Sequence, residues 1–265
     1  MIAELSAVVC VALIASTLTF FSGFGLGTLL LPAFAVFMPI ELAVAATAVV
    51  HLANGLLKAA LMGRHADRVV LIRFGGVAVL AAAGGAVLQD VLAAVPPVAE
   101  WTAFGRVFQV TAIKLAVAAV MAGFAALEIH PAFERLAFAR RWLPLGGLIS
   151  GFFGGLSGHQ GALRSAFLAR CDLTKEAFIG TGAMIAVVID VARLGVYLPE
   201  RIGTMRELGS SGERIGWLVI AGVVAAFAGT FVGQRLVKKV TLGGVRLTVA
   251  VMLMVVSTLL AAGVL

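Results

Sequence analysis

The chain has 265 residues, of which 62% are hydrophobic and 12% are charged, and its formal net charge is +7. A soluble domain is about half apolar and about a quarter charged, so this composition excludes a single water-soluble domain, and it also excludes a disordered chain. We therefore expect an α-helical protein that crosses the membrane several times, in which the 31 glycines lie at close contacts between helices.

The first apolar region, residues 6–38, is too long for one membrane helix and is interrupted by Ser22-Gly23-Phe24-Gly25-Leu26-Gly27. One crossing needs about 20 apolar residues. In transporters, glycine-rich breaks inside hydrophobic segments are places where half-helices meet. We predict a helical hairpin whose tip lies inside the membrane or the protein, and a kinked ordinary span is the alternative.

Six other segments each have the length and apolarity of one transmembrane helix: 41–62, 69–88, 107–127, 177–197, 215–233 and 245–264. Between the third and fourth of them, region 144–168 is broken by a second glycine-rich stretch, which predicts a second hairpin. We expect residues 128–143 to form an amphipathic cytoplasmic linker and residues 198–214 to form a solvated, flexible loop.

The basic loop residues favour this arrangement over one in which the second region crosses once. If both hairpins enter and leave on one side, ten basic loop residues share a side: Arg64, Arg68, Arg135, Arg140, Arg141, Arg170, Lys175, Arg235, Lys238 and Lys239. The opposite side carries four: Arg106, Arg201, Arg206 and Arg214. Because basic residues concentrate in cytoplasmic loops, we predict a protein of the cell (inner or plasma) membrane with both termini on the non-cytoplasmic side.

The two halves of the chain match weakly at an offset of 134 residues. The matched pairs are Gly27 with Gly161, Leu29 with Leu163, Ala43 with Ala177, and Thr47 with Thr181. Each half, residues 1–127 and residues 144–265, reads as a glycine-broken hairpin followed by three spans. Since the two hairpins open from opposite sides, the predicted fold is all-α with two inverted repeats, which is typical of secondary transporters.

These patterns resemble the TauE/SafE sulfite-exporter family over nearly the whole chain. The resemblance rests on Ser22-Gly23-Phe24-Gly25-Leu26-Gly27-Thr28-Leu29-Leu30-Leu31-Pro32, on Ala43-x3-Thr47 and on the repeated second half. The second copy, Gly158-His159-Gln160-Gly161-Ala162-Leu163-Arg164-Ser165, departs from the first because it lacks the proline and is more polar. The resemblance implies transport of sulfite or a related organosulfur anion, usually outward.

The hairpin tips are the predicted substrate site. A half-helix that starts near a glycine presents free backbone N–H groups and the positive end of its dipole, which suits an anion. This reasoning selects Gly25, Gly27, Thr28 and Gly161. At the second tip, Arg164 offers a planar fork for oxyanion oxygens, and His159 and Gln160 offer further donors.

Polar side chains inside the spans complete the predicted site, because such groups are costly in a membrane and mark functional positions. His51 and Asn54 lie on one helical face with Lys58, and Asp190 and Arg193 lie on another with Tyr197. Several alternatives stay open: Arg164 pairs with Asp190 instead of substrate, Asp190 and Arg193 form a structural pair, and His51 is either a packing residue or a proton site. Lys58 is expected to extend toward the membrane surface.

The predicted function is therefore transport of a small anion bound near the membrane midplane, with export of sulfite or a related organosulfur anion as the leading hypothesis. Uptake of an organic sulfonate or carboxylate is one alternative, and a non-transporting membrane assembly factor is another. No catalytic motif, metal-ligand spacing or nucleotide-binding pattern occurs in the sequence, so no enzyme, cofactor or nucleic-acid partner is expected. A proton as coupling ion and assembly into a homo-oligomer stay open.

Overall fold

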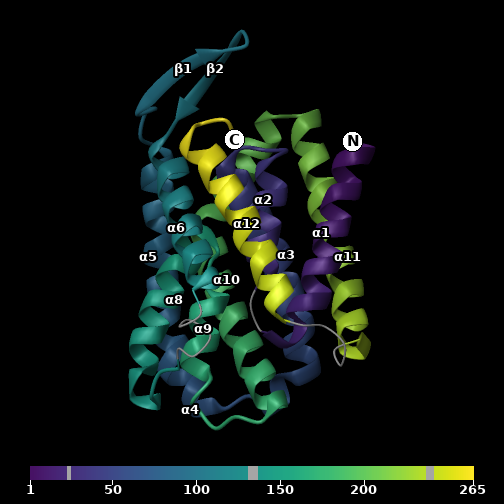
Figure 1. The fold of residues 1–265 in the computed structure, drawn as a ribbon, viewed down its shortest axis with the longest axis vertical. Helices are drawn as coiled ribbons and strands as arrows, with labels where there is room; N and C mark the ends of the chain where they lie inside the picture. The colour runs from purple at the N-terminus through teal and green to yellow at the C-terminus, as the bar shows by residue number, and fades with distance from the viewer. Residues whose placement is uncertain (23–24, 131–136, 237–241) are drawn as a thin grey trace.

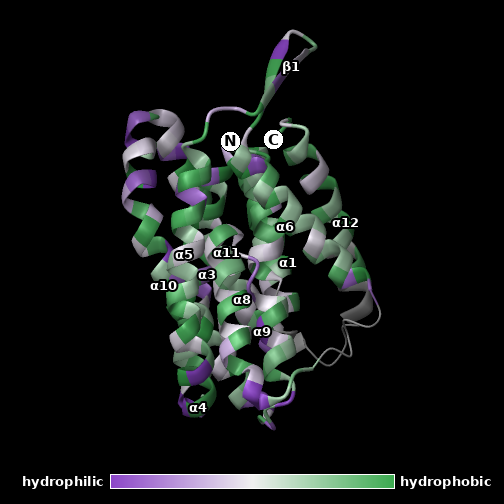
Figure 2. Cartoon of the chain, turned by 90° about the vertical axis from the view of Figure 1, so that its left-hand side faces the viewer, coloured by the Kyte–Doolittle hydropathy of each residue, from purple (hydrophilic) through white to green (hydrophobic). Residues whose placement is uncertain are grey.

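The computed structural model describes residues 1–22, 25–130, 137–236 and 242–265. The described chain is a bundle of helices, and one β-hairpin projects from the end at which both termini lie (Figure 1). Hydrophobic residues cover most of the length of the helices, and hydrophilic residues gather mainly toward the two ends of the bundle (Figure 2). This distribution is the one expected of a bundle whose sides face lipid.

The first half of the chain contains these elements: α1 (Ile2–Ser22), α2 (Leu26–Ala35), α3 (Ile40–Met62), the 3₁₀ turn η1 (Gly63–His65), α4 (Arg68–Val70), the π-helical segment η2 (Leu71–Gly75), α5 (Gly76–Ala93), β1 (Ala99–Ala103), β2 (Arg106–Val110) and α6 (Ala112–Ile129). The second half contains η3 (Arg140–Trp142), α8 (Leu143–Ser157), α9 (Gly161–Leu168), α10 (Lys175–Glu207), α11 (Ser210–Leu236) and α12 (Leu242–Ala261). Strands β1 and β2 pair antiparallel, with Trp101 opposite Phe108.

Among the described residues, six helical segments are long and apolar enough to cross a membrane: Ile2–Phe20, Ile40–His65, Arg68–Ala93, Ala112–Ile129, Lys175–Glu207 and Ser210–Arg235. The predicted class of multi-span helical membrane protein is confirmed. The set of helices differs slightly from the prediction. The first arm of region 6–38 is itself of full crossing length, whereas α2 and the 250–261 part of α12 are shorter apolar helices.

Two predicted boundaries are wrong. The span predicted at 107–127 begins in a strand, because residues 106–110 form β2 and the helix starts only at Ala112. The flexible loop predicted at 198–214 is helical over most of its length, since α10 continues through Pro199 to Glu207 and α11 begins at Ser210. Buried Arg201 stabilises this extension by pairing with Asp90 of α5. Of the predicted amphipathic linker at 128–143, residues 131–136 lie outside the described residues.

Glycines let helices approach one another closely at two long seams. On α8, Gly147, Gly151 and Gly155 face the backbone of η2 and α5, and a Cβ added to Gly155 would lie 2.0 Å from the Ala82 carbonyl oxygen. On α11, Gly229 faces α1 in the same way, with its added Cβ 2.4 Å from the Leu13 oxygen. Helices in lipid associate by close packing of this kind, because burial from water does not drive them together.

Both glycine-rich breaks are chain reversals with a left-handed glycine. Gly25 precedes α2 with a φ of 108°, and Gly158 ends α8 with a φ of 83°, a region that glycine enters without the steric cost of a side chain. The two breaks meet, because a Cβ on Gly27 would lie 3.4 Å from the Gly158 carbonyl oxygen. Helix α1 starts at the end that holds the termini. The chain enters α8 from the opposite end, where Arg140 pairs with Asp67 at 3.1 Å.

Candidate functional site

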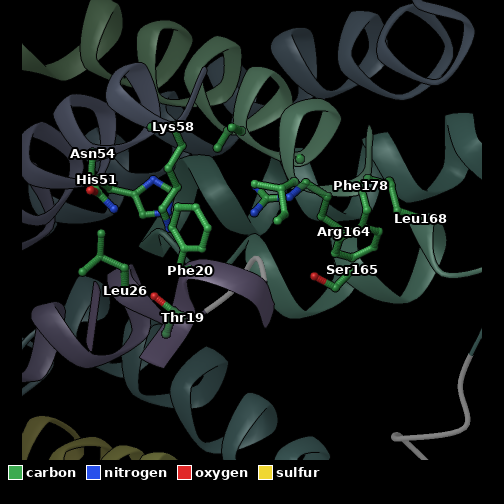
Figure 3. Close-up of a pocket in the computed structure, with 15 residues that line it drawn as sticks. Thr19, Phe20, Leu26, His51, Asn54, Lys58, Arg164, Ser165, Leu168 and Phe178 are labelled. Carbon is green, nitrogen blue, oxygen red and sulfur yellow. The ribbon is translucent and has the colours of Figure 1, made fainter. Parts of the chain in front are cut away.

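A cavity of about 40 Å³ lies beside the two breaks, between α1, α2, α3, α9 and α10. Its polar lining consists of six side chains: Thr19, His51, Asn54, Lys58, Arg164 and Ser165. Figure 3 shows these residues around the cavity together with the apolar side chains of Phe20, Leu26 and Phe178. A water needs about 10–15 Å³ on this scale, so the space holds about three waters or one small oxyanion.

Helix α3 supplies three of the polar groups from one face. His51, Asn54 and Lys58 are separated by three and four residues, the spacing that places side chains in one row on a helix. Asn54 is 1% exposed, and its Oδ1 accepts a hydrogen bond from Thr230 Oγ1 at 2.6 Å. This bond ties α3 to α11 and fixes the orientation of the amide in the cavity wall.

The sequence led us to expect that Lys58 extends toward the membrane surface, and this prediction is wrong. The Nζ of Lys58 lies over the ring of Phe20, 5.6 Å from the centroid, and the side chain lines the cavity with Arg164. The π face of the ring favours a cation at this distance. The cavity wall thus carries two basic side chains from different halves of the chain.

Arg164 comes from the short helix α9 and is 3% exposed. Its Nη1 donates to Gln160 Oε1 at 3.1 Å, and Figure 3 shows the side chain reaching from α9 toward α3. Gly182 of α10 lies beside it, and an added Cβ there would make an ordinary contact at 3.6 Å from Arg164 Nε. A guanidinium held at a cavity wall is well suited to bind oxyanion oxygens.

Asp190 of α10 is fully buried behind the cavity and joins three elements. Its Oδ1 accepts hydrogen bonds from Arg193 Nε at 3.0 Å and from Gln160 Nε2 at 3.2 Å. Its Oδ2 lies 2.6 Å from His51 Nδ1, and because a carboxylate accepts, the imidazole donates. The predicted pair of Asp190 with Arg193 is confirmed, with a shortest N···O distance of 2.8 Å. Arg164 is linked to Asp190 through Gln160.

The structure places the other predicted residues near the breaks but outside the cavity lining. Gly25 caps α2 and Gly161 begins α9. Gly27 lies beside His51, because an added Cβ would be 3.6 Å from the His51 ring. Thr28 is half-buried on α2. His159 is 2% exposed, its Nδ1 lies 3.1 Å from Ser157 Oγ, and its ring stacks on Phe124 of α6.

No group of three His, Cys, Asp or Glu side chains that could hold a metal ion occurs within the described ranges. The polar lining of the cavity offers two cationic side chains, an imidazole, an amide and two hydroxyls. Such a wall can bind an anion and release it unchanged.

Among the polar residues that line the cavity, Thr19 and Ser165 were not predicted from the sequence. Lys58 was noticed but was not predicted to line a cavity. The helical spacing from His51 to Asn54 to Lys58 was a usable signal for Lys58, since it placed all three on one face. Thr19 and Ser165 carry no comparable signal, because small hydroxyl residues are ordinary components of membrane helices.

Comparison with known proteins identifies the family. No curated protein and no solved structure gives a significant match to this chain. The family model described as sulfite exporter TauE/SafE matches residues 8–260, a range that covers both glycine-rich breaks and every helix that lines the cavity. The chain therefore belongs to the TauE/SafE sulfite exporter family, a family of membrane transporters.

Proposed function

We propose that this transporter carries a small, doubly charged oxyanion, with sulfite as the family-implied substrate, and that the anion binds in the cavity between Lys58 and Arg164. The observation that carries this proposal is the convergence of these two basic side chains on one cavity of about 40 Å³ in the apolar part of the bundle. A cation buried in a membrane is costly, and proteins retain one where it serves a function. Two of them at one cavity match two negative charges.

The size and donors of the cavity support the same substrate class. Sulfite has four heavy atoms, and the space is that of about three waters. The side chains of Asn54 and Ser165 line the same space and supply neutral polar groups around the two cations. Thr19 also lines it, but its hydroxyl donates to the Ala15 carbonyl oxygen. Charge-assisted hydrogen bonds from Lys or Arg to an oxyanion are about twice as strong as neutral ones, so Lys58 and Arg164 supply most of the affinity.

Alternating access by two inverted repeats fits the helix arrangement. In each half a helix, a glycine break and a short helix precede three longer elements. Helix α1 packs along α11 through close glycine contacts, and α8 packs along α5 in the corresponding way. Gly27 of the first break and Gly158 of the second meet beside the cavity. A site where the tips of two opposed repeats meet is the usual place for substrate in such transporters.

The position of the cavity supports export. It is lined by the second half of α3, by α9 and by the first half of α10, which lie in the half of the bundle away from the termini. The basic loop residues favour this end as the cytoplasmic one. The anion would then enter from the cytoplasm and leave on the side where both termini lie.

The test is sulfite flux into proteoliposomes that hold the purified protein. Arg164→Gln removes the fork from the cavity, and Lys58→Gln removes the ammonium. Losing a hydrogen bond to a charged group costs about 1.5–3 kcal/mol, so we expect each variant to bind sulfite roughly 10- to 100-fold more weakly. The matched control for the charge change is Arg170→Gln, an exposed arginine two residues beyond α9.

Three outcomes separate the alternatives. Sulfite flux that survives both cavity substitutions at the level of the Arg170→Gln control would refute the assigned site. Transport of an organic sulfonate or a carboxylate without sulfite would favour the uptake permease. An unmodified protein that moves none of these anions would favour a membrane assembly role.

A further inference from the structure

We propose that the anion travels together with a proton, and that His51, hydrogen-bonded to Asp190, is the group that carries it. This inference rests on the proposed function, because it assigns a coupling ion to the same cavity. The observations behind it are the position of His51 at the cavity wall, its contact with a fully buried carboxylate, and the charges that surround it.

His51 is the link between the cavity and the buried carboxylate. The imidazole lines the cavity, whereas Asp190 lies behind it with 0% exposure. The Nδ1 of His51 is 2.6 Å from Asp190 Oδ2, so the other ring nitrogen, Nε2, is left to exchange a proton with water or substrate in the cavity. Imidazole is the side chain that gains and loses a proton most readily near neutral pH.

The charges that face His51 come from every polar element packed around it. Lys58 lies two turns further along its own helix, Arg164 projects from α9, and Asp190 and Arg193 project from α10. Helix α2, which approaches His51 through Gly27, contributes no ionisable side chain. With a neutral imidazole, three cations therefore surround one carboxylate. The net charge of this group of side chains is then positive.

An anion in the cavity reverses this balance. Its negative charge stabilises the imidazolium ion, and by thermodynamic reciprocity a protonated His51 strengthens anion binding by the same factor. Proton and anion therefore favour occupying the cavity together. This coupling leads to cotransport of the two in one direction, whereas an exchanger would require each to exclude the other.

Gln160 connects proton uptake with the anion-binding arginine. Its Nε2 donates to Asp190 and its Oε1 accepts from Arg164, which fixes the orientation of the amide. When His51 becomes a cation, it draws more of the Asp190 charge toward Oδ2. The Oδ1 side then holds Gln160 less strongly, and the Arg164 fork gains freedom to turn toward the anion.

The anion and proton that move together carry a net charge, so the membrane potential acts on their transport. A doubly charged oxyanion with one proton carries a single negative charge across the membrane. A membrane potential that is negative inside acts on each transported charge in proportion to the voltage. It therefore drives this complex outward, which agrees with export and with a cavity at the proposed cytoplasmic end.

The experiment measures sulfite and protons together in proteoliposomes. The membrane potential is clamped at zero with K⁺ and valinomycin, and both sides are held at the same alkaline pH, at which free sulfite is doubly deprotonated. Any acidification of the lumen during sulfite entry then reports a proton carried with the anion. A trapped pH dye and radiolabelled sulfite give the ratio of protons to sulfite, which does not depend on the amount of active protein.

We expect about one proton per sulfite for the unmodified protein and a ratio near zero for His51→Asn, because the asparagine amide keeps a donor near the Nδ1 position but cannot carry a proton across. His51→Gln is the second variant if the asparagine protein does not fold. His65→Asn is the matched control, since His65 lies at the same end of the bundle and is exposed. It should keep the ratio of the unmodified protein.

Two results overturn the inference. One is sulfite entry into the unmodified system without acidification. The other is a His51 variant that keeps the proton ratio, which would place the proton on another group such as Lys58. If the unmodified protein moves no sulfite at all, the proposed function fails first, and that outcome is distinct from sulfite flux without protons.

Discussion

Substituting Gly85 by alanine tests whether the bundle depends on backbone contact between α5 and α8. A Cβ at Gly85 would lie 2.2 Å from the Phe152 carbonyl oxygen and 2.9 Å from the Leu156 nitrogen. Carbon and carbonyl oxygen in contact are normally about 3.3–3.6 Å apart. The two helices would therefore have to separate by roughly 1 Å at this point. Gly84, the preceding residue, has no heavy atom within 4 Å of its own Cβ position and provides a matched control.

The expected loss of stability follows from the packing contacts that are weakened along this seam. A gap of up to about 1 Å forfeits a quarter to a half of each dispersion contact, and the seam also includes Gly147, Gly151 and Gly155. Inserting a methyl group into tight packing costs about 1–3 kcal/mol, and we take about 3 kcal/mol because backbone atoms cannot move aside. The better helix propensity of alanine returns about 1 kcal/mol. Gly85→Ala should thus be about 2 kcal/mol less stable than the unmodified protein, and Gly84→Ala up to about 1 kcal/mol more stable.

Thermal unfolding in detergent measures both variants. A change of 1 kcal/mol shifts Tm by about 2–4 °C in chains of 150–250 residues, so Gly85→Ala should unfold about 4–8 °C lower, and Gly84→Ala at or above the unmodified Tm. If the two variants unfold at the same temperature, the close approach of α5 and α8 is not a source of stability and this reasoning is refuted.

Two further outcomes are expected. Thr230→Val removes the hydroxyl that donates to the buried Asn54 Oδ1 and lies 2.9 Å from Ser16 Oγ, which should destabilise the protein by about 1–3 kcal/mol. Thr258→Val, at an exposed position of α12, should change Tm little, and equal shifts would contradict the role of the Asn54 contact. Burial raises the pKa of the Cys171 thiol, which lies in the segment between α9 and α10. A raised pKa leaves less thiolate at neutral pH, so maleimide should label Cys171 slowly, and the labelling rate should rise only at higher pH. The comparison is a Cys171→Ser protein that carries a new cysteine at exposed Ala169, which should label faster. Equal labelling rates would show that the Cys171 thiol is accessible.

Sequence reasoning located the glycine breaks because their signal is local. Ser22–Gly27 and Gly154–Gly161 interrupt apolar runs, and the structure places a left-handed glycine at each break, Gly25 and Gly158. The β-hairpin was missed because the apolar residues of β2 continue directly into α6 and extend its hydrophobic run. The available signal was Phe104-Gly105, where two successive positive φ angles form the tight turn of a hairpin.

The errors at Lys58 and at 198–214 have a common physical cause. Charged side chains near the end of a hydrophobic run are usually solvated, and that expectation holds only when no buried partner is near. Arg201 finds Asp90 of α5, 111 residues away in sequence, so the helix continues where a polar loop was expected. Lys58 finds the Phe20 ring and a cavity shared with Arg164, so its ammonium stays inside. Neither partner is visible in the local sequence.

Asp190 shows why the site required the fold. The sequence placed Asp190 and Arg193 on one helical face and His51 on another. It left open whether the first two form a structural pair and whether His51 is a packing residue or a proton site. In the structure one carboxylate serves both, with Oδ1 accepting from Arg193 and Oδ2 lying against His51, which is 139 residues away. Because Arg193 holds the carboxylate in place, the second oxygen is positioned for the imidazole. The structural pair is therefore what presents His51 to the cavity, and removing Arg193 should alter transport through His51 even though Arg193 does not line the cavity.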